Sequence, residues 1–312
     1  KQYNSYKGLV MAGYQGWFNT PGDGSGRGWH HYNGRNGFRP GSCSVDLWPE
    51  VSEYKKLYKT EFSFADGKPA YVFSSHDEST VDVHFRWMKE YGLDGVFMQR
   101  FITEIRNESG LKHFNKVLNS AMKSANKYER AICVMYDLSG MKPGEEGLLL
   151  KDIAEIARQY SIKDHVKNPS YLYHNGKPLV TVWGVGFNDN RRYGLKEAER
   201  IIDGLKLQGF SVMLGAPTQW RELKRDTIVE FKGQWYAFYH NSALSNHDWL
   251  RSICVDKLYH NPDGTIKLVK QTKSTPITVQ KKYPFRNPLT GGMNVCMVLD
   301  VLNIMSQYFR RQ

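Results

Sequence analysis

Short apolar runs alternate with amphipathic stretches over the first two thirds of the chain. Runs of four to six residues predict β-strands over residues 9–14, 70–74, 95–98, 131–136, 179–183 and 211–214. Between most of them, apolar residues at helical spacing predict helices over residues 79–91, 113–128, 148–160 and 195–208. Because strands joined by crossover helices form a parallel sheet, we expect six parallel strands in a βα barrel or an open doubly wound sheet.

Two features of the strand ends favour the barrel. No GxGxxG sequence follows the first run, although a dinucleotide-binding doubly wound sheet would carry one there. Polar and aromatic residues follow nearly every run, and in a barrel these carboxyl ends converge on one mouth. They include Gln15, Trp17, Asp77, Gln99, Arg100, Asp137, Trp220 and Arg221.

The pattern changes after Arg221. Residues 228–240 predict two strands around a turn at Lys232-Gly233, and residues 250–272 predict a second hairpin. Residues 293–309 predict a buried helix that ends at two arginines. Two strand–helix units of a complete eight-stranded barrel are missing from this part. We therefore predict an α/β fold, with an incomplete (β/α)₈ TIM-barrel-like domain over residues 1–222 and an antiparallel β segment with a C-terminal helix over residues 223–312.

Composition and charge add a hint about the ligand. Aromatic residues make up 13% of the chain, and Trp and Tyr stack on flat apolar faces, which suggests a ring-shaped ligand. The formal net charge of +12 is dispersed and weighted toward the tail, where 13 basic and 6 acidic residues lie from residue 223 onward. Since no basic cluster is interleaved with aromatic residues, we expect no nucleic-acid partner.

Cysteine spacing and hydropathy bear on metals, membranes and the cellular compartment. The four cysteines, Cys43, Cys133, Cys254 and Cys296, lack the CxxC spacing of zinc sites, so we expect neither a metal nor a cofactor. Cys133 and Cys254 lie in apolar runs and are expected to be buried free thiols. No apolar run reaches the length of a membrane span. The polar first residues suggest that a signal or lipoprotein peptide is absent or already removed.

Long stretches of the first domain are similar to known glycosidases. The sequences GLVMAGYQGWFNTPGDGSGRGWHHY, CSVDLWPEVSEY, VFSSHDESTVDVHFRWMKEYGLDGVFMQRF, ICVMYDLSGM, LVTVWGVGFND and SVMLGAPTQWR follow one another between residues 6 and 221. They resemble the bacterial proteins similar to glycoside hydrolase families 71 and 99. The resemblance implies a (β/α)₈ barrel and endo-acting hydrolysis of α-glucans or α-mannans.

The tail resembles a different glycosidase family. Residues 229–272 are similar to the last blade of the five-bladed propellers of glycoside hydrolase family 43, the β-xylosidase and α-arabinofuranosidase group. That family draws its three catalytic carboxylates from earlier blades, which have no counterpart here. A His-Arg-Ser motif that usually precedes the blade is replaced by Lys224-Arg225-Asp226.

The candidate catalytic residues are Asp137 and Asp77. Families 71 and 99 place two acids three residues apart late in the barrel, and the matching portion of this chain stops before that point. Because glycoside hydrolysis needs two carboxyl groups flanking the bond, the acids at the predicted strand ends become the candidates. Turn or helix capping is the alternative role for each. For Glu104 we expect a surface ion pair with Arg106 or Lys112.

Substrate-binding candidates are aromatic and polar residues near the predicted mouth. Indole rings stack on apolar sugar faces, while polar side chains hydrogen-bond the hydroxyls. The candidates are Trp17, His30, His31, Trp48, Gln99, Arg100, Trp183, Trp220 and Arg221. Core packing is the alternative for Trp48 and Trp183, and a structural ion pair is the alternative for both arginines. The glycine-rich residues 22–28 (GDGSGRG) predict a lid or a tight surface loop.

The sequence thus predicts a secreted or periplasmic, monomeric carbohydrate-active protein of the glycoside hydrolase type. Its partner would be a glycan or polysaccharide with O-glycosidic bonds, of α-mannan or α-glucan type or of the xylosidase and arabinosidase type. The alternative is a non-catalytic carbohydrate-binding remnant that lacks the catalytic pair. A third hypothesis is a chain that forms no stable functional unit.

Overall fold

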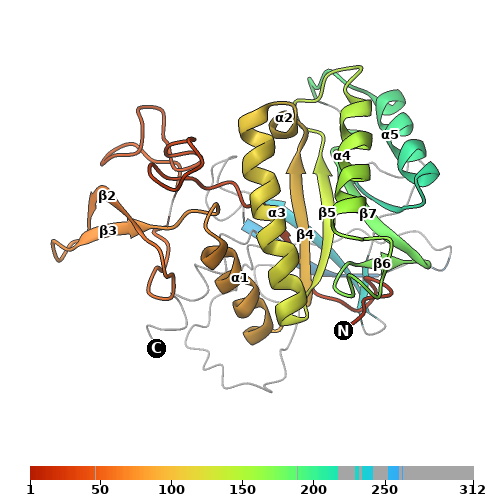
Figure 1. The fold of residues 1–312 in the computed structure, drawn as a ribbon, viewed down its shortest axis with the longest axis horizontal. Coiled ribbons are helices and arrows are strands. Elements are labelled where there is room, and N and C mark those ends of the chain that lie inside the picture. Colours follow the sequence, from red (N-terminus) through yellow and green to blue (C-terminus); the bar gives the residue numbers. More distant parts are fainter. Residues whose placement is uncertain are drawn as a thin grey trace.

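A parallel sheet organises the first two thirds of the protein. The computed structural model describes residues 1–45, 47–187, 189–216, 229–231, 234–241, 252–259 and 262. The parallel strands lie in the order β1 (Met11–Tyr14), β4 (Gly95–Phe101), β5 (Ala131–Asp137), β7 (Lys177–Trp183) and β8 (Ser211–Gly215). The short β6 (Tyr173–His174) pairs antiparallel with the start of β7. Figure 1 shows the sheet with its helices.

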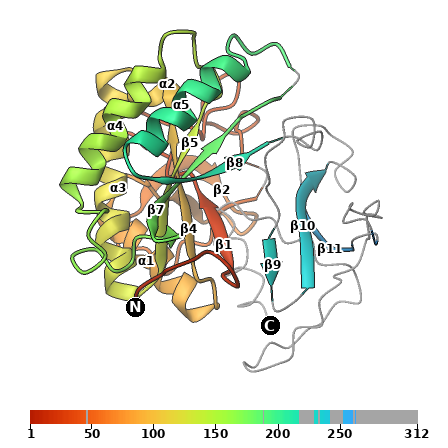
Figure 2. The same ribbon diagram turned by 90° about the vertical axis from the view of Figure 1, so that its right-hand side faces the viewer.

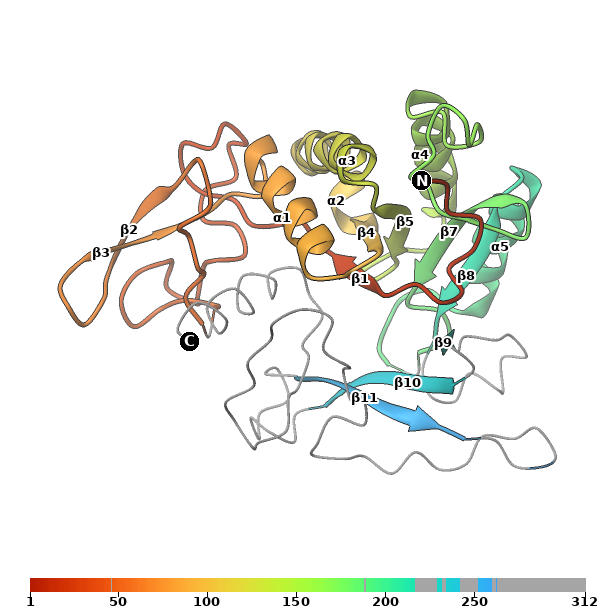
Figure 3. The same ribbon diagram turned by 90° about the horizontal axis from the view of Figure 1, so that it is seen from below.

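The helices cover one face of this sheet. They are α1 (Glu78–Glu90), α2 (Ile102–Ile105), α3 (Glu108–Tyr128), α4 (Glu146–Gln159) and α5 (Leu195–Leu207). Figures 2 and 3 show α1, α3, α4 and α5 on the same side of the strands. Doubly wound sheets have helices on both faces, whereas βα barrels have them outside only. The mixed α/β fold with a parallel sheet is confirmed, and within the described residues the sheet is open between β1 and β8.

One strand predicted for the parallel sheet is placed elsewhere. The run at residues 70–74 contributes to β3 (Pro69–Val72), which pairs antiparallel with β2 (Tyr58–Ser63) beside the main sheet (Figure 1). Strand β1 pairs directly with β4, so among the described residues the sheet has five parallel strands and not six. A partner across a short turn is reached at a low cost in loop-closure entropy, which favours this hairpin.

The two faces of the parallel sheet bury different side chains. The helix-covered face forms the main core, in which Tyr14, Val96, Val134 and Val180 are buried. We call the opposite face the inner face, because it lines the interior in a βα barrel. Side chains from every parallel strand pack there, in a second cluster with Tyr3 and Leu172: Met11, Phe97, Ala131, Cys133, Leu179 and Met213. The prediction that Cys133 is a buried free thiol is confirmed.

The tail is β structure where the structure describes it. Strands β9 (Val229–Phe231), β10 (Gln234–Asn241) and β11 (Ser252–Leu258) form an antiparallel sheet in the order β9, β10, β11. This confirms the first predicted hairpin and the first strand of the second. The remainder of the second hairpin and the helix predicted over residues 293–309 lie outside the described residues.

None of the described helices combines the length and the apolar character that crossing a lipid bilayer requires.

Candidate functional site

The carboxyl ends of four parallel strands align a row of side chains on the inner face. Phe101 of β4 is paired with Asp137 of β5, Asp137 with Trp183 of β7, and Trp183 with Gly215 of β8. Neighbouring positions in such a row are about 4.8 Å apart. Because side chains alternate along a strand, and because Val182 and Tyr136 lie in the main core, Asp137 and Trp183 point away from the helices. The ring of Phe101, at the end of the row, contacts the ring of Phe114 on α3, with 5.7 Å between the centroids. We call Phe101, Asp137, Trp183 and Gly215 the carboxyl-end row.

Asp137 is the carboxylate of this row. Its side chain is 6% exposed, and its Oδ1 accepts a hydrogen bond of 2.8 Å from the backbone N–H of Ser139. That bond is the turn-capping role given as the alternative in the sequence analysis. It engages one of the two carboxylate oxygens, and the strand pairing places the residue between two aromatic residues. Asp137 therefore lies where the sequence placed it, and its catalytic role remains a prediction.

Trp183 ends β7, and its indole lies over Gly215. A Cβ atom added to Gly215 would stand 2.3 Å from Cε3 of Trp183. The indole of Trp183 also contacts the ring of Phe187, with 5.2 Å between the ring centroids. Trp183 is only partly buried, as a ring at the rim of a ligand site would be. Glycine at position 215 thus sets the position of the indole.

Gly215→Ala is expected to lower the free energy of unfolding by about 1–3 kcal/mol, because the new methyl group overlaps the Trp183 ring. Urea denaturation measures this change. Gly147→Ala is the matched control: it lies in α4, where an added Cβ meets nothing within 4 Å, and alanine should stabilise that helix by about 0.5–1 kcal/mol. Equal effects of the two substitutions would show that the indole does not depend on Gly215.

A stack of aromatic rings joins the carboxyl-end row at Phe101. The indole of Trp17 stacks on the ring of His31 at 4.0 Å and on that of Phe101 at 5.4 Å, with 16° between the planes in both pairs. The His31 ring already covers part of the surface that a sugar would use on Trp17. Burial lowers the pKa of His31 to about 4, so this imidazole is neutral near pH 7. No described residue pairs with the buried Nε1 of Trp17.

The glycine-rich residues 22–28 form a loop held by Asp23. This carboxylate accepts hydrogen bonds from the backbone N–H groups of Thr20 and Ser25, the amide of Asn19 and the hydroxyl of Ser74, at 2.7–3.1 Å. Burial raises the pKa of Asp23, but the hydrogen bonds from Ser25, Ser74 and Asn19 outweigh it and hold the pKa well below its usual range. Asp23 therefore anchors the loop as a charged carboxylate, and both of its oxygens accept hydrogen bonds.

Glu104 links Arg27 of this loop to His30, which precedes His31 of the aromatic stack. Its Oε2 accepts a hydrogen bond of 2.8 Å from Nη1 of Arg27, and its Oε1 lies 3.6 Å from Nε2 of His30. Burial raises the pKa of Glu104, but the contacts with His30 and Arg27 outweigh it and lower the pKa to about 2. Glu104 is thus a carboxylate at any ordinary pH. The expected pairing of Glu104 with Arg106 or Lys112 is replaced by Arg27, and Arg106 pairs with Glu145 instead.

Arg100 faces the helices and not the inner face. Its side chain is 3% exposed and donates from Nε and Nη2 to the two carboxylate oxygens of Asp152 on α4, at 2.5 and 2.6 Å. Nη2 also donates to Asn115 of α3, at 2.6 Å. This is the structural ion pair that the sequence left open for Arg100. Gln99 precedes Arg100 in β4. Because side chains alternate along a strand, Gln99 lies on the inner face with Phe97 and Phe101, where it is partly buried.

Two further candidates lie away from the carboxyl-end row. The carboxylate of Asp77 accepts from Nζ of Lys56 on one oxygen and from the Tyr58 hydroxyl on the other, both at 2.8 Å. It is the N-cap residue of α1 but makes no side-chain capping bond. Trp48 donates its indole N–H to the Tyr71 carbonyl at 2.8 Å and packs against the main core. Both are tied to the β2–β3 hairpin.

The remaining candidates concern metals and the tail. His30 and His31 are adjacent and follow the loop of residues 22–28, with 4.6 Å between their ring centroids. Across the described part of the chain, no three His, Cys, Asp or Glu residues gather in a way that could hold a metal ion. Trp220 and Arg221 lie outside the described residues.

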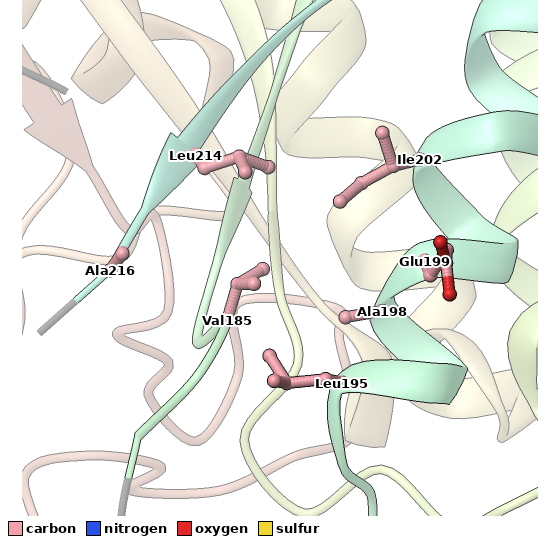
Figure 4. A pocket seen from close by; sticks show the side chains of 7 residues that line it. All are labelled: Val185, Leu195, Ala198, Glu199, Ile202, Leu214 and Ala216. Carbon is pink, nitrogen blue, oxygen red and sulfur yellow. The ribbon is translucent and has the colours of Figure 1, made fainter. Parts of the chain in front are cut away.

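An apolar cavity lies apart from these polar groups, between β8 and α5. It measures about 210 Å³ and is lined by Val185, Leu195, Ala198, Glu199, Ile202, Leu214 and Ala216. Figure 4 shows Leu214 and Ile202 pointing toward each other across it. Its walls offer one carboxylate and otherwise no polar side chain, so it suits an apolar group rather than a sugar.

Sequence reasoning missed Arg27 and Phe101 as members of the site. Arg27 stands between two glycines directly before Trp29 and the histidine pair, and that local composition was the available signal. Its partner Glu104 is 77 positions away, so the pairing cannot be read from spacing. Phe101 directly follows Gln99 and Arg100, and strand alternation puts it on the Gln99 side.

Comparisons with known proteins give one short sequence match and partial structural likenesses. No family model matches the chain. A β-xylosidase from Xylanibacter ruminicola is 49% identical over 45 residues, which are 14% of this chain and 14% of that protein.

Among solved structures, two of the GH99 endo-α-mannosidase from Bacteroides thetaiotaomicron are similar, one of them in complex with BIS-TRIS-propane. Their TM-scores are 0.37 and 0.39 at 16% and 15% identity, and the alignments cover 55% of this chain. The chain spans 41% and 44% of those structures, so less than half of either.

Proposed function

We propose that this protein is carbohydrate-active and of the glycoside hydrolase type, acting on O-glycosidic bonds of a glycan. The carboxyl-end row is the observation that supports this most directly, because it sets Asp137 between Phe101 and Trp183 at one edge of the inner face. Aromatic rings beside a carboxylate suit a sugar ring and its glycosidic oxygen. The stack of Trp17 and His31 extends the same surface.

The proposal includes the architecture and the substrate class. Residues 1–222 would form an incomplete (β/α)₈ barrel and residues 223–312 a separate β segment with a terminal helix. The substrate would be an α-mannan, an α-glucan, or a xyloside or arabinoside. The protein would act as a monomer in the periplasm or outside the cell.

Hydrolysis requires an acid that protonates the leaving oxygen and a second carboxylate that acts as nucleophile or base. Asp137 is the residue that we propose for one of these roles. Asp77 is a weaker candidate for the other, since Lys56 and Tyr58 engage both of its oxygens.

A non-catalytic, carbohydrate-binding role is the second candidate. The observation that favours it is that Asp137 is the sole carboxylate among the four residues of the carboxyl-end row. Rings and hydrogen-bonding groups suffice for binding, whereas bond cleavage needs two carboxyl groups.

Asp137→Asn is expected to reduce the release of reducing sugar by about 100-fold or more, because an amide can neither ionise nor donate a carboxyl proton. The assay uses α-mannan, α-1,3-glucan and arylxylosides as substrates. Asp66→Asn is the control, since Asp66 pairs with Lys68 on an exposed turn and should leave activity unchanged.

Three outcomes separate the candidates. Activity that Asp137→Asn abolishes and Asp66→Asn preserves supports the enzyme. An inactive protein that binds one of these glycans in calorimetry supports the binding role. A folded protein that neither cleaves nor binds any of them contradicts both.

A further inference from the structure

We propose that Arg27, on the loop of residues 22–28, forms a subsite for the carboxylate of an acidic glycan. The proposal rests on the proposed function, because it takes the ligand to be a glycan and specifies its chemical class as one that contains uronic acid. It concerns the loop and Glu104, which the carboxyl-end row does not include.

The first observation is that Arg27 is buried with half of its hydrogen-bonding edge unused. Its side chain is 7% exposed, and Nη1 donates to Oε2 of Glu104 at 2.8 Å. Nε and Nη2 are buried, and neither atom makes a hydrogen bond to a described residue. A buried donor without an acceptor destabilises the protein, and more strongly when it is charged. Such a group calls for an acceptor from outside the chain.

Two other arginines of this protein show which acceptor fits the Nε–Nη2 edge. Arg100 donates from these two atoms to the two oxygens of Asp152, at 2.5 and 2.6 Å. Arg191 does the same with Asp189, at 2.5 and 2.7 Å. The parallel N–H groups of this edge match the spacing of carboxylate oxygens, and such paired, charged bonds are about twice as strong as neutral ones. The edge of Arg27 presents the same donors.

The charges around Arg27 are mixed. Arg27 is paired with Glu104, and at His113 burial lowers the pKa, the Arg27 cation lowers it further and the Asp23 carboxylate raises it. At His76, burial lowers the pKa, Lys116 and Lys112 lower it further, and Asp23 and Asp77 raise it. The preference for a carboxylate therefore rests on the unused donors of Arg27 and not on the net charge of the region.

The groups beside Arg27 suit the rest of a sugar ring. Glu104 links Arg27 to His30, and His31 next to it stacks on Trp17. The indole N–H of Trp17 is a second buried donor that no described residue satisfies. A ligand with a carboxylate and neighbouring hydroxyls would supply acceptors to both Arg27 and Trp17.

The glycine side of the loop is open. Gly26 and Gly28 flank Arg27 with φ of 71° and 64°, in the left-handed region that glycine adopts without strain. An added Cβ at Gly22, Gly24, Gly26 or Gly28 would meet nothing within 4 Å, so this side of the loop is not packed against other residues. Asp23 and the Arg27–Glu104 pair hold the loop at two points, and the unpacked glycine side is where the ligand would approach Arg27.

The test compares matched oligosaccharides by calorimetry at low ionic strength. Neutral oligosaccharides of the α-mannan, α-1,3-glucan and xylan series are paired with uronate forms, in which a C6 carboxylate or a glucuronic acid branch is present. The methyl ester of each uronate removes the charge and keeps the shape. We expect the uronate to bind at least about tenfold more tightly than its ester or neutral counterpart.

Variants of the protein test whether Arg27 is responsible for the tighter binding of the uronate. Arg27→Lys keeps the charge but loses the paired Nε and Nη2 donors, and should reduce the preference for the uronate below about threefold. Arg86→Lys is the control, because Arg86 pairs with Glu53 and Glu90 around α1 and should keep the full preference. If Arg27→Lys fails to fold, the ester comparison on the unchanged protein still decides the question.

Equal binding of the uronate, its ester and the neutral form overturns this inference and leaves the proposed function standing. A preference that survives in folded Arg27→Lys also overturns it. The failure of every oligosaccharide to bind contradicts the proposed function itself, and the acidic subsite with it.

Discussion

Asp152→Ala is expected to lower the free energy of unfolding by about 3–5 kcal/mol, because it leaves the Arg100 guanidinium charged and unpaired in the core. Asp152 is 8% exposed and accepts from Nε and Nη2 of Arg100 and from the hydroxyl of Tyr136. The substitution removes the carboxylate that joins β4 and β5 to α4. Urea denaturation at pH 7 measures the loss.

A matched control separates burial from charge. Glu78→Gln breaks the pair with Lys123, in which both side chains are 59% exposed, and should cost at most about 1 kcal/mol. Replacing both buried partners, by Arg100→Met with Asp152→Leu, should recover much of the loss, because no charge then remains in the core. If Asp152→Ala costs no more than Glu78→Gln, the buried pair does not stabilise the sheet against its helices.

The protein is expected to lose stability as the pH falls from about 6.5 to about 4. Burial lowers the pKa of His84 to about 3, and burial lowers those of His113 and His31 to about 4. Unfolded histidine has a pKa near 6.5, so in this window the unfolded chain binds more protons than the folded one, and stability decreases with decreasing pH. Each such histidine contributes up to about 1.4 kcal/mol per pH unit.

His84 is the residue through which to test this dependence. Its Nδ1 and Nε2 lie 2.9 and 2.7 Å from the hydroxyls of Tyr14 and Tyr54, inside the main core. His84 alone accounts for a decrease of about 3 kcal/mol between pH 6.5 and 4. Urea denaturation at half-unit pH steps measures it. His84→Gln cannot titrate, so its stability should vary less over this range, and equal slopes for both proteins would contradict the explanation.

Local patterns predicted most of the elements but not all of their partners. The four helices predicted between the apolar runs, and all six of these runs, appear close to their predicted positions, whereas α2, β2 and β6 are not predicted. The run at residues 70–74 lies in a different sheet from the one predicted, because its partner β2 carries Lys59 and Glu61 and does not have the pattern of a strand. An apolar run alone does not tell whether its partner is parallel or antiparallel.

The roles of the candidate site residues also depend on partners that are distant in the sequence. Asp77 and Asp137 both follow strand-like runs, and only the folded chain shows that Lys56 and Tyr58 engage Asp77 while Asp137 stands in the carboxyl-end row. Arg100 and Gln99 are adjacent, and which one faces the helices depends on the position of Asp152, 52 residues away. Long-range partners of this kind leave no trace in local spacing.

The order of strands in the sheet bears on how the chain folds during synthesis. Each parallel strand lies beside the one made just before it, so each βα unit can dock on a preformed edge as it leaves the ribosome. The contacts of Tyr3 do not follow this order, since the backbone N–H of Tyr173 donates to its carbonyl at 2.8 Å. Tyr3 therefore cannot complete its pairing until β6 has been made, and this late contact fastens the residues before β1 to a sheet already largely assembled.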